Sequence, residues 1–177
     1  LLVCTAFVVF PVFSSTAYGQ YCSASASYCD EYIGNVNVAG INNSSGCSGY
    51  ADYSASVAPG SMDPGAPYTI TVTNGGYPYS GDIVFVWVDW NDNQSFLDPG
   101  EFFSTTTSNY ALFTGTVSPP VGTQMGNKRM RVRMSYYVSS PGNPCGSEAF
   151  GEVEDYTIFV TGCKPPQITA PPSITLN

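Results

Sequence analysis

Hydrophobic and polar residues alternate in several short segments of the chain, and this pattern predicts an all-β protein. Alternation places successive side chains on opposite faces of a strand, so that one face can be buried. Residues 83–88 are apolar at every position, which predicts a central strand covered on both faces. The expected strands span residues 32–38, 50–57, 68–73, 83–88, 111–117, 129–136 and 153–160.

The spacing of these strands, with turn residues between them, is typical of a sandwich. We therefore predict a two-sheet antiparallel β-sandwich, jelly-roll-like, over residues 21–162. The polar cluster at residues 42–46 is interpreted as a turn between strands.

The two ends of the chain have a different composition from the predicted domain. Residues 1–20 resemble part of a signal peptide, with an apolar run too short to span a bilayer comfortably. The start has no Met and no basic segment, so we expect a fragment of a longer chain. Residues 163–177 are interpreted as a proline-rich linker and the start of a truncated next module, which resembles a hyalin-repeat or immunoglobulin-like module.

Charge and composition narrow the function classes. Among 177 residues there are 5 Lys plus Arg and 13 Asp plus Glu, a net charge of −8. A nucleic-acid partner is not expected, because phosphate binding needs a basic face. Histidine is absent, and the chain has no GxSxG or HExxH motif, so we do not expect an enzyme. We expect a secreted or cell-surface protein with no membrane span in the mature domain.

Five of the six cysteines follow the predicted leader. In an oxidising compartment, disulfides are more common than catalytic thiols. Cys163 is the natural leftover of this odd count, because it begins the tail. The other four allow three pairings, of which we favour Cys29 with Cys47 and Cys22 with Cys145.

An acidic loop follows the apolar run at residues 83–88. Its oxygen-bearing side chains recur at every second position, as in peptides that wrap calcium, and oxygen ligands favour calcium over zinc or copper. The alternative is a polar hairpin loop whose side chains bond their own backbone. The candidate calcium ligands are Asp89, Asn91, Asn93, Ser95, Asp98 and Glu101.

Two later segments carry opposite charges. Arg129, Arg131 and Arg133 share one face of a predicted strand, and an apolar face lies opposite. Three such cations need anions nearby, and the candidates are Glu152, Glu154 and Asp155. A structural ladder of ion pairs is the favoured interpretation. A glycosidase carboxylate pair is less consistent, because Glu152 and Glu154 are too close in sequence to flank a substrate.

Several motifs in order make residues 21–161 resemble the GEVED domain family. They include Trp87-Val88-Asp89-Trp90-Asn91, Arg129-Met130-Arg131-Val132, Pro144-Cys145-Gly146 and the string Gly151-Glu152-Val153-Glu154-Asp155-Tyr156. The resemblance implies a β-sandwich accessory domain of large secreted or surface proteins of bacteria, with no established catalytic activity. Members of the family usually have Asp-Gly in the acidic loop where this chain has Asn93-Gln94.

We therefore expect a non-catalytic extracellular accessory or adhesion domain that is stabilised by calcium. Its expected partners are a surface glycan or protein ligand and neighbouring domains of the same chain. Tyrosines in or near predicted loops could stack on sugars, although ordinary sandwich packing is an alternative role for them: Tyr77, Tyr79, Tyr110, Tyr136 and Tyr137. The alternative function is an accessory or pro-domain of a secreted peptidase.

Overall fold

The computed structural model describes residues 20–162, and all regular structure in that range is β-strand. The predicted leader up to residue 19, Cys163 and the predicted linker and next module lie outside the described residues. The strands are β1 (Ala24–Tyr28), β2 (Ile33–Val38), β3 (Ile41–Ser44), β4 (Tyr50–Asp52), β5 (Gly60–Met62), β6 (Tyr68–Asn74), β7 (Asp82–Asp89), β8 (Phe102–Thr107), β9 (Leu112–Val117), β10 (Gly126–Tyr136), β11 (Gly146–Phe150) and β12 (Glu152–Val160). This part of the chain contains no helix that could cross a membrane.

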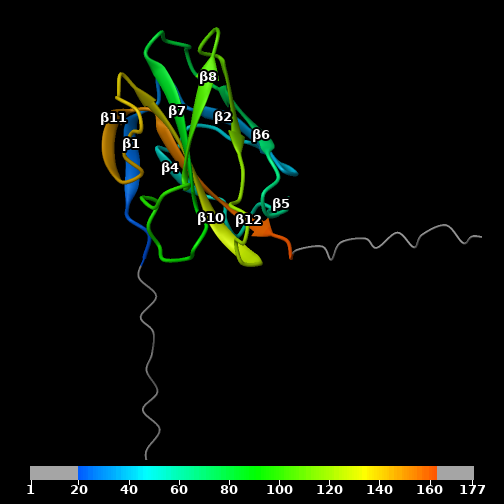
Figure 1. Ribbon diagram of the computed structural model, residues 1–177. Coiled ribbons are helices and arrows are strands. Elements are labelled where there is room, and N and C mark those ends of the chain that lie inside the picture. The colour runs from blue at the N-terminus through cyan, green and yellow to red at the C-terminus, as the bar shows by residue number, and fades with distance from the viewer. Residues whose placement is uncertain (1–19, 163–177) are drawn as a thin grey trace, which may run out of the picture.

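The main sheet curls on itself to form a sandwich (Figure 1). Its strand order is β3-β2-β6-β9-β8-β7-β10-β12-β4, and β5 also pairs with β12. Strand β8 pairs with β9 on one side and with β7 on the other, so it joins the two halves. One hydrophobic core draws residues from both halves, including Ile33, Val72 and Phe113 from one and Val86 and Met130 from the other. The predicted β-sandwich is confirmed.

A two-stranded ribbon of β1 and β11 lies against the outer side of the β7–β10–β12 half (Figure 1). A second buried cluster, made by Phe85, Trp87 and Phe96, lies on this outer side and packs against Tyr21 near the N-terminal end of the described chain. Strand β7 is consequently covered on both faces. This confirms the interpretation of the apolar run at residues 83–88.

Two disulfides hold the outer layer and an adjacent loop. Cys22 pairs with Cys145 and joins the segment before β1 to the segment before β11, with Cα atoms 5.5 Å apart. Cys29 pairs with Cys47 at a Cα separation of 5.8 Å. These are the two pairings that the sequence favoured.

The structure corrects three details of the predicted strands. Strands β1, β3, β5, β8 and β11 were not predicted, because they are short or rich in Ser, Thr and Gly. The turn placed at residues 42–46 is wrong, since Ile41–Ser44 is a strand and the chain reverses at Ala39 and Gly40, both with positive φ. The all-antiparallel expectation is also wrong, because β1 pairs with β11, and β4 and β5 pair with β12, in parallel. Long connections between these strands permit the parallel pairing.

Candidate functional site

The acidic loop connects β7 to β8 at the end of the β7–β8 hairpin. Asp89 ends β7 and is fully buried. Its Oδ2 atom accepts hydrogen bonds from the Tyr21 hydroxyl at 2.7 Å and from the Gln94 backbone N–H at 2.8 Å. Its Oδ1 atom is buried and has no hydrogen-bond partner among the described residues. A buried carboxylate oxygen without a partner is unfavourable, so this atom is a natural contact for a cation.

Alternate side chains of the loop bond the backbone two residues further on. Asn91 Oδ1 accepts from the Asn93 N–H at 3.0 Å, Asn93 Oδ1 accepts from the Ser95 N–H at 2.9 Å, and Ser95 Oγ accepts from the Leu97 N–H at 3.1 Å. These bonds are the turns expected of the hairpin alternative. Gln94 has a φ of 67°. That left-handed conformation is strained for a residue other than glycine, so glycine would fit this position better than Gln94.

Asp98 and Glu101 complete the loop. The amide groups of Asn91 and Asn93 donate to Asp98 Oδ2 at 3.3 and 2.7 Å. Glu101 accepts from the Trp90 N–H at 3.0 Å, and burial raises the pKa of its carboxyl group. Thus the six predicted ligands lie in one loop. Within residues 20–162, however, no three or more Asp, Glu, His or Cys side chains are arranged to hold a metal ion. A calcium ion would need amide and hydroxyl oxygens as well as Asp89.

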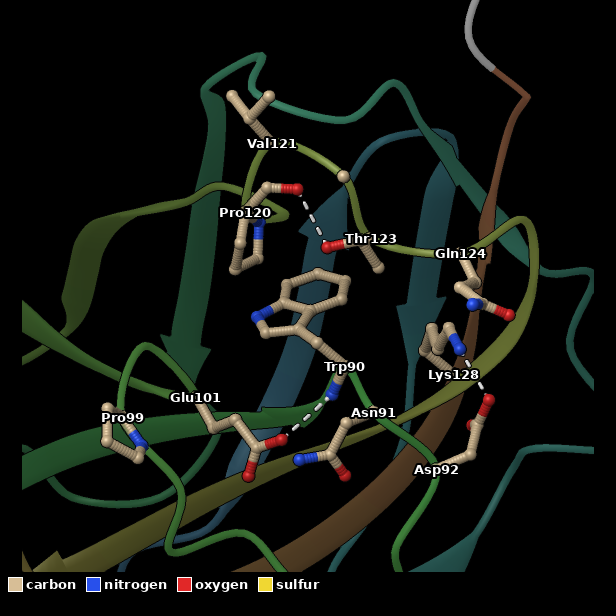
Figure 2. A pocket seen from close by; sticks show the side chains of 11 residues that line it. Trp90, Asn91, Asp92, Pro99, Glu101, Pro120, Val121, Thr123, Gln124 and Lys128 are labelled. Carbon is tan, nitrogen blue, oxygen red and sulfur yellow. Dashed lines mark hydrogen bonds and ion pairs between the residues drawn. The ribbon is translucent and has the colours of Figure 1, made fainter.

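A hollow of about 490 Å³ lies beside this loop (Figure 2). Trp90 lies in its wall with an indole ring that is mostly buried, and the ring N–H donates to the Gly100 carbonyl at 3.2 Å. Figure 2 shows the Lys128–Asp92 ion pair on one side of the ring and the Glu101 carboxylate on another. A change in the part of the loop that lines the hollow, such as Asn91 or Asp92, would therefore alter its wall.

Arg129, Arg131 and Arg133 share one face of β10, as predicted, but most of their predicted partners are wrong. Arg131 is 1% exposed and forms a two-point contact with Asp155, through Nε to Oδ1 at 2.7 Å and Nη2 to Oδ2 at 2.8 Å. Arg129 contacts Asp52 at 3.0 Å and Asp155 at 3.5 Å. The Arg133 guanidinium contacts Glu148 at 3.3 Å. Asp52 and Glu148 come from β4 and β11, and sequence reasoning missed both.

Glu152 and Glu154 do not contact the arginines, which corrects the expected ion-pair ladder. Strand register explains this, because Val132 of β10 lies opposite Glu154, and Met134 lies opposite Glu152. Both glutamates therefore share the apolar face of β10 rather than its arginine face. Among the described residues, Asp155 alone of the three carboxylates reaches an arginine.

The two glutamates instead accept hydrogen bonds from the start of β2, from the segment between β3 and β4, and from Tyr156 of β12. Glu152 accepts from the Ser48 N–H at 2.7 Å and from the Ile33 N–H at 3.0 Å. Glu154 accepts from the Ser45 and Tyr156 hydroxyls, each at 2.6 Å. Burial raises the pKa of Glu154 to about 7 and also raises the pKa of Glu152. These carboxylates act as hydrogen-bond anchors between β12 and the opposite layer.

The glycine that precedes them is required by close backbone approach. Gly151 has a φ of 104°, and a Cβ atom there would lie 2.0 Å from the Met134 carbonyl oxygen. Any other residue would have to shift the β10 backbone. The Gly-Glu-Val-Glu-Asp string is therefore explained by structural roles at each polar position.

Four of the five predicted tyrosines meet on one surface, and two aromatic residues that were not predicted join them. The closest ring pairs are Tyr136 with Tyr137 at 4.7 Å and Tyr77 with Tyr79 at 4.8 Å between centroids. Tyr79 with Tyr136 at 5.8 Å connects these pairs. The fifth, Tyr110, packs against the main core. The aromatic surface comprises Tyr28, Tyr77, Tyr79, Tyr136, Tyr137 and Phe150.

Tyr28 and Phe150 enter this surface because β1 and β11 pair in parallel with these two residues in register. Their ring centroids lie 5.5 Å apart, and Phe150 lies 6.0 Å from Tyr136. Tyr137 is 75% exposed and Tyr77 is 66% exposed, so much of the surface faces solvent. No local signal in the sequence places residues 28 and 150 side by side.

Comparison with known families shows that residues 83–159 match the GEVED domain. No curated protein matches the chain. The matched segment runs from β7 to β12. Earlier strands belong to the same sandwich, because β6 pairs with β9, and β4 and β5 pair with β12.

Proposed function

Because residues 83–159 form a GEVED domain, a family of accessory domains, we propose that this protein is a non-catalytic extracellular domain that binds carbohydrate through its aromatic surface. The observation that carries the proposal is the continuous contact among six aromatic rings, several of them widely exposed. Exposed apolar patches rimmed by polar groups mark ligand-binding surfaces. Tyrosine combines a flat apolar face with a hydroxyl, which suits a ligand whose rings carry both C–H and O–H groups.

The disulfides support the extracellular part of the proposal. Cys22–Cys145 anchors the β1–β11 ribbon, which carries Tyr28 and Phe150. Cys29–Cys47 joins the residue after Tyr28 to the loop between β3 and β4. Disulfides persist in oxidising compartments and are rare in the cytosol. The same bonds would hold the aromatic surface in one conformation outside the cell, which lowers the entropic cost of ligand binding.

A glycan array followed by calorimetry tests carbohydrate binding. We expect at least one class of glycan to be retained, and we expect the double variant Tyr77→Ala/Tyr137→Ala to weaken its affinity about tenfold or more, equal to about 1.4 kcal/mol. Phe159→Ala is the matched control, since Phe159 is a 39% exposed aromatic residue outside the aromatic surface. Failure to retain any glycan, or equal affinity of the double variant and the control, would refute the proposal.

We also propose that calcium stabilises the β7–β8 loop. The support is the unpartnered buried Oδ1 atom of Asp89 and the oxygen atoms at every second position after it. Asn91, Asn93 and Ser95 would supply neutral oxygens, and Asp98 or Glu101 a second carboxylate. The ion would neutralise the Asp89 carboxylate and fix the conformation of the loop, part of which forms the wall of the hollow beside Trp90.

Thermal unfolding with calcium or with excess chelator tests this second proposal. A ligand present at 100 times its dissociation constant stabilises the folded state by about 2.7 kcal/mol, so the melting temperature should rise by several degrees. Asp89→Asn should abolish the calcium-dependent rise, whereas the control Asp52→Asn, outside the loop, should retain it. A wild-type melting temperature that is identical in calcium and in chelator would contradict calcium binding.

The alternative function, an accessory or pro-domain of a secreted peptidase, stays a prediction. No observation in the described part of the chain favours it over ligand binding by the aromatic surface.

A further inference from the structure

A small acidic pocket opens within the aromatic surface. Its volume is about 160 Å³, and its lining residues are Tyr79, Tyr136 and Phe150, together with Asp30 and Glu31. Pockets for drug-sized ligands are larger, from about 300 Å³ upward, so this one suits a single functional group. The combination of aromatic walls and carboxylates limits which group that is.

Two buried carboxylates beneath the aromatic surface have oxygens without partners. Glu31 is 1% exposed and Asp82 is 4% exposed. Glu31 Oε1 and Asp82 Oδ1 both lack a hydrogen-bond partner among the described residues. The other oxygen of Asp82 accepts from the Tyr79 N–H at 2.8 Å, which fixes this carboxylate next to the pocket wall. Burial first, and then the charge of Asp82, raises the pKa of Glu31 to about 7.

No side-chain cation compensates this negative charge within residues 20–162. The four cations of that range form their ion pairs elsewhere: Lys128 with Asp92, Arg129 with Asp52 and Asp155, Arg131 with Asp155, and Arg133 with Glu148. Buried charges in proteins are normally paired or bound to a cation. Asp30, Glu31 and Asp82 therefore leave the pocket electrostatically incomplete.

We propose that this pocket binds the ammonium group of an amino sugar. A cation near the face of an aromatic ring is attracted by the ring quadrupole, and this attraction adds to that of a carboxylate. A metal ion fits less well, because three of the five lining residues are aromatic and a metal needs several oxygen ligands. The exposed rings of Tyr77 and Tyr137 adjoin the pocket through Tyr79 and Tyr136, so neighbouring sugar rings can stack beside it.

This inference rests on the proposed function and adds the charge of the ligand to it. Sugar hydroxyls alone would leave the Glu31 carboxylate without a counter-charge whenever it is ionised. An ammonium group supplies the missing positive charge, and its loss by acetylation removes that charge without changing the sugar ring. Acetylation therefore separates the charge requirement from stacking on the tyrosines.

Calorimetry with two matched oligosaccharides tests the inference. The probes are chitosan oligomers of glucosamine and chitin oligomers of N-acetylglucosamine of equal length, with choline and a lysine-containing peptide as ammonium groups from other sources. We expect the glucosamine oligomer to bind at least tenfold more tightly than its acetylated form. Glu31→Gln should remove this preference for the glucosamine oligomer.

Two further variants keep the test decisive. Because Glu31 is buried, Glu31→Gln must first retain the wild-type melting temperature within a few degrees, and otherwise Asp30→Asn replaces it. Phe159→Ala, outside the pocket, should keep the full preference for glucosamine.

The outcomes separate this inference from the proposed function. Equal binding of both oligomers, unaffected by Glu31→Gln, overturns the ammonium pocket and leaves carbohydrate binding intact. Binding of choline or the peptide without either sugar overturns the amino-sugar ligand, and the glycan array again decides carbohydrate binding separately. Binding of none of the four probes overturns the ammonium pocket, while the glycan array decides carbohydrate binding separately.

Discussion

Replacing Asp155 with Asn should destabilise the domain far more than the same change at Asp52. Both carboxylates contact arginines of β10, but their surroundings differ. The side chains of Arg131 and Asp155 are only 2% and 1% exposed, and two hydrogen bonds of 2.7 and 2.8 Å join them. The Asp52 side chain is 44% exposed.

The magnitude follows from this difference in burial. Removing one partner of a buried ion pair leaves the other charge uncompensated and costs about 3–5 kcal/mol. An Asn at position 155 would also direct an N–H group toward guanidinium N–H groups, which adds repulsion. Exposed ion pairs contribute about 0–1 kcal/mol, so Asp52→Asn should have little effect. For a domain of this size the change at Asp155 corresponds to a fall in melting temperature of about 6–20 °C.

Urea denaturation followed by tryptophan fluorescence measures both variants. Trp87 and Trp90 are 1% and 5% exposed, so their emission should shift when the sandwich unfolds. Urea is preferable to guanidinium chloride because it is uncharged and does not screen the ion pair. A second variant, Arg131→Met, should also be destabilised, since it leaves the buried Asp155 carboxylate with only the longer Arg129 contact at 3.5 Å and the Tyr50 hydroxyl at 3.1 Å.

The reasoning is refuted if Asp155→Asn and Asp52→Asn lose the same free energy of unfolding within about 1 kcal/mol. Such a result would mean that water reaches the Arg131–Asp155 contact in solution. It would also mean that the β1–β11 ribbon and the segment around Cys22 do not cover this face, although Arg131 Nη1 donates to the Cys22 carbonyl at 2.9 Å.

Two further predictions concern cross-links and pH. Replacing Cys22 and Cys145 by Ser should lower the free energy of unfolding by about 5 kcal/mol, and replacing Cys29 and Cys47 by Ser should lower it by roughly 3 kcal/mol. The first loss is larger because the paired cysteines are 123 rather than 18 residues apart. A larger fall in the urea midpoint on loss of the shorter cross-link would contradict this. The pKa of Glu154 is raised in the folded protein from 4.5 to about 7, so the stability linked to its protonation is fully present below about pH 4.5 and lost as the pH rises through about 7. Glu154→Gln should therefore flatten the fall in stability between pH 5 and 8 by up to ~3 kcal/mol, and identical pH profiles of the two proteins would show that Glu154 is not buried as described.

Local periodicity determined much of the fold from the sequence. The alternation in residues 129–136 placed Met130, Val132 and Met134 in the core, and the structure confirms this with zero exposure for all three. The apolar run at residues 83–88 indicated a strand covered on both faces, which β7 is. These inferences succeed because the direction of a side chain in a strand depends only on its parity and on which face is buried.

The functional candidates depended on pairings that parity does not contain. Parity placed Glu152 and Glu154 on one face of their strand. The register of β10 against β12 decided that this face is shared with Val132 and Met134 and not with the arginines. The aromatic surface needed the parallel pairing of β1 with β11, which brings Tyr28 beside Phe150. The acidic pocket needed Glu31, before β2, to approach Asp82, at the start of β7.

The sequence by itself therefore determined the longer, more apolar strands, the apolar faces of those strands and the residue types that are available for chemistry. Only the tertiary structure decided which carboxylates are paired and which stay uncompensated. The physical reason is that the free energy of a charge depends on its desolvation and on neighbours distant in the chain, whereas the hydrophobic pattern of a strand is written in consecutive residues.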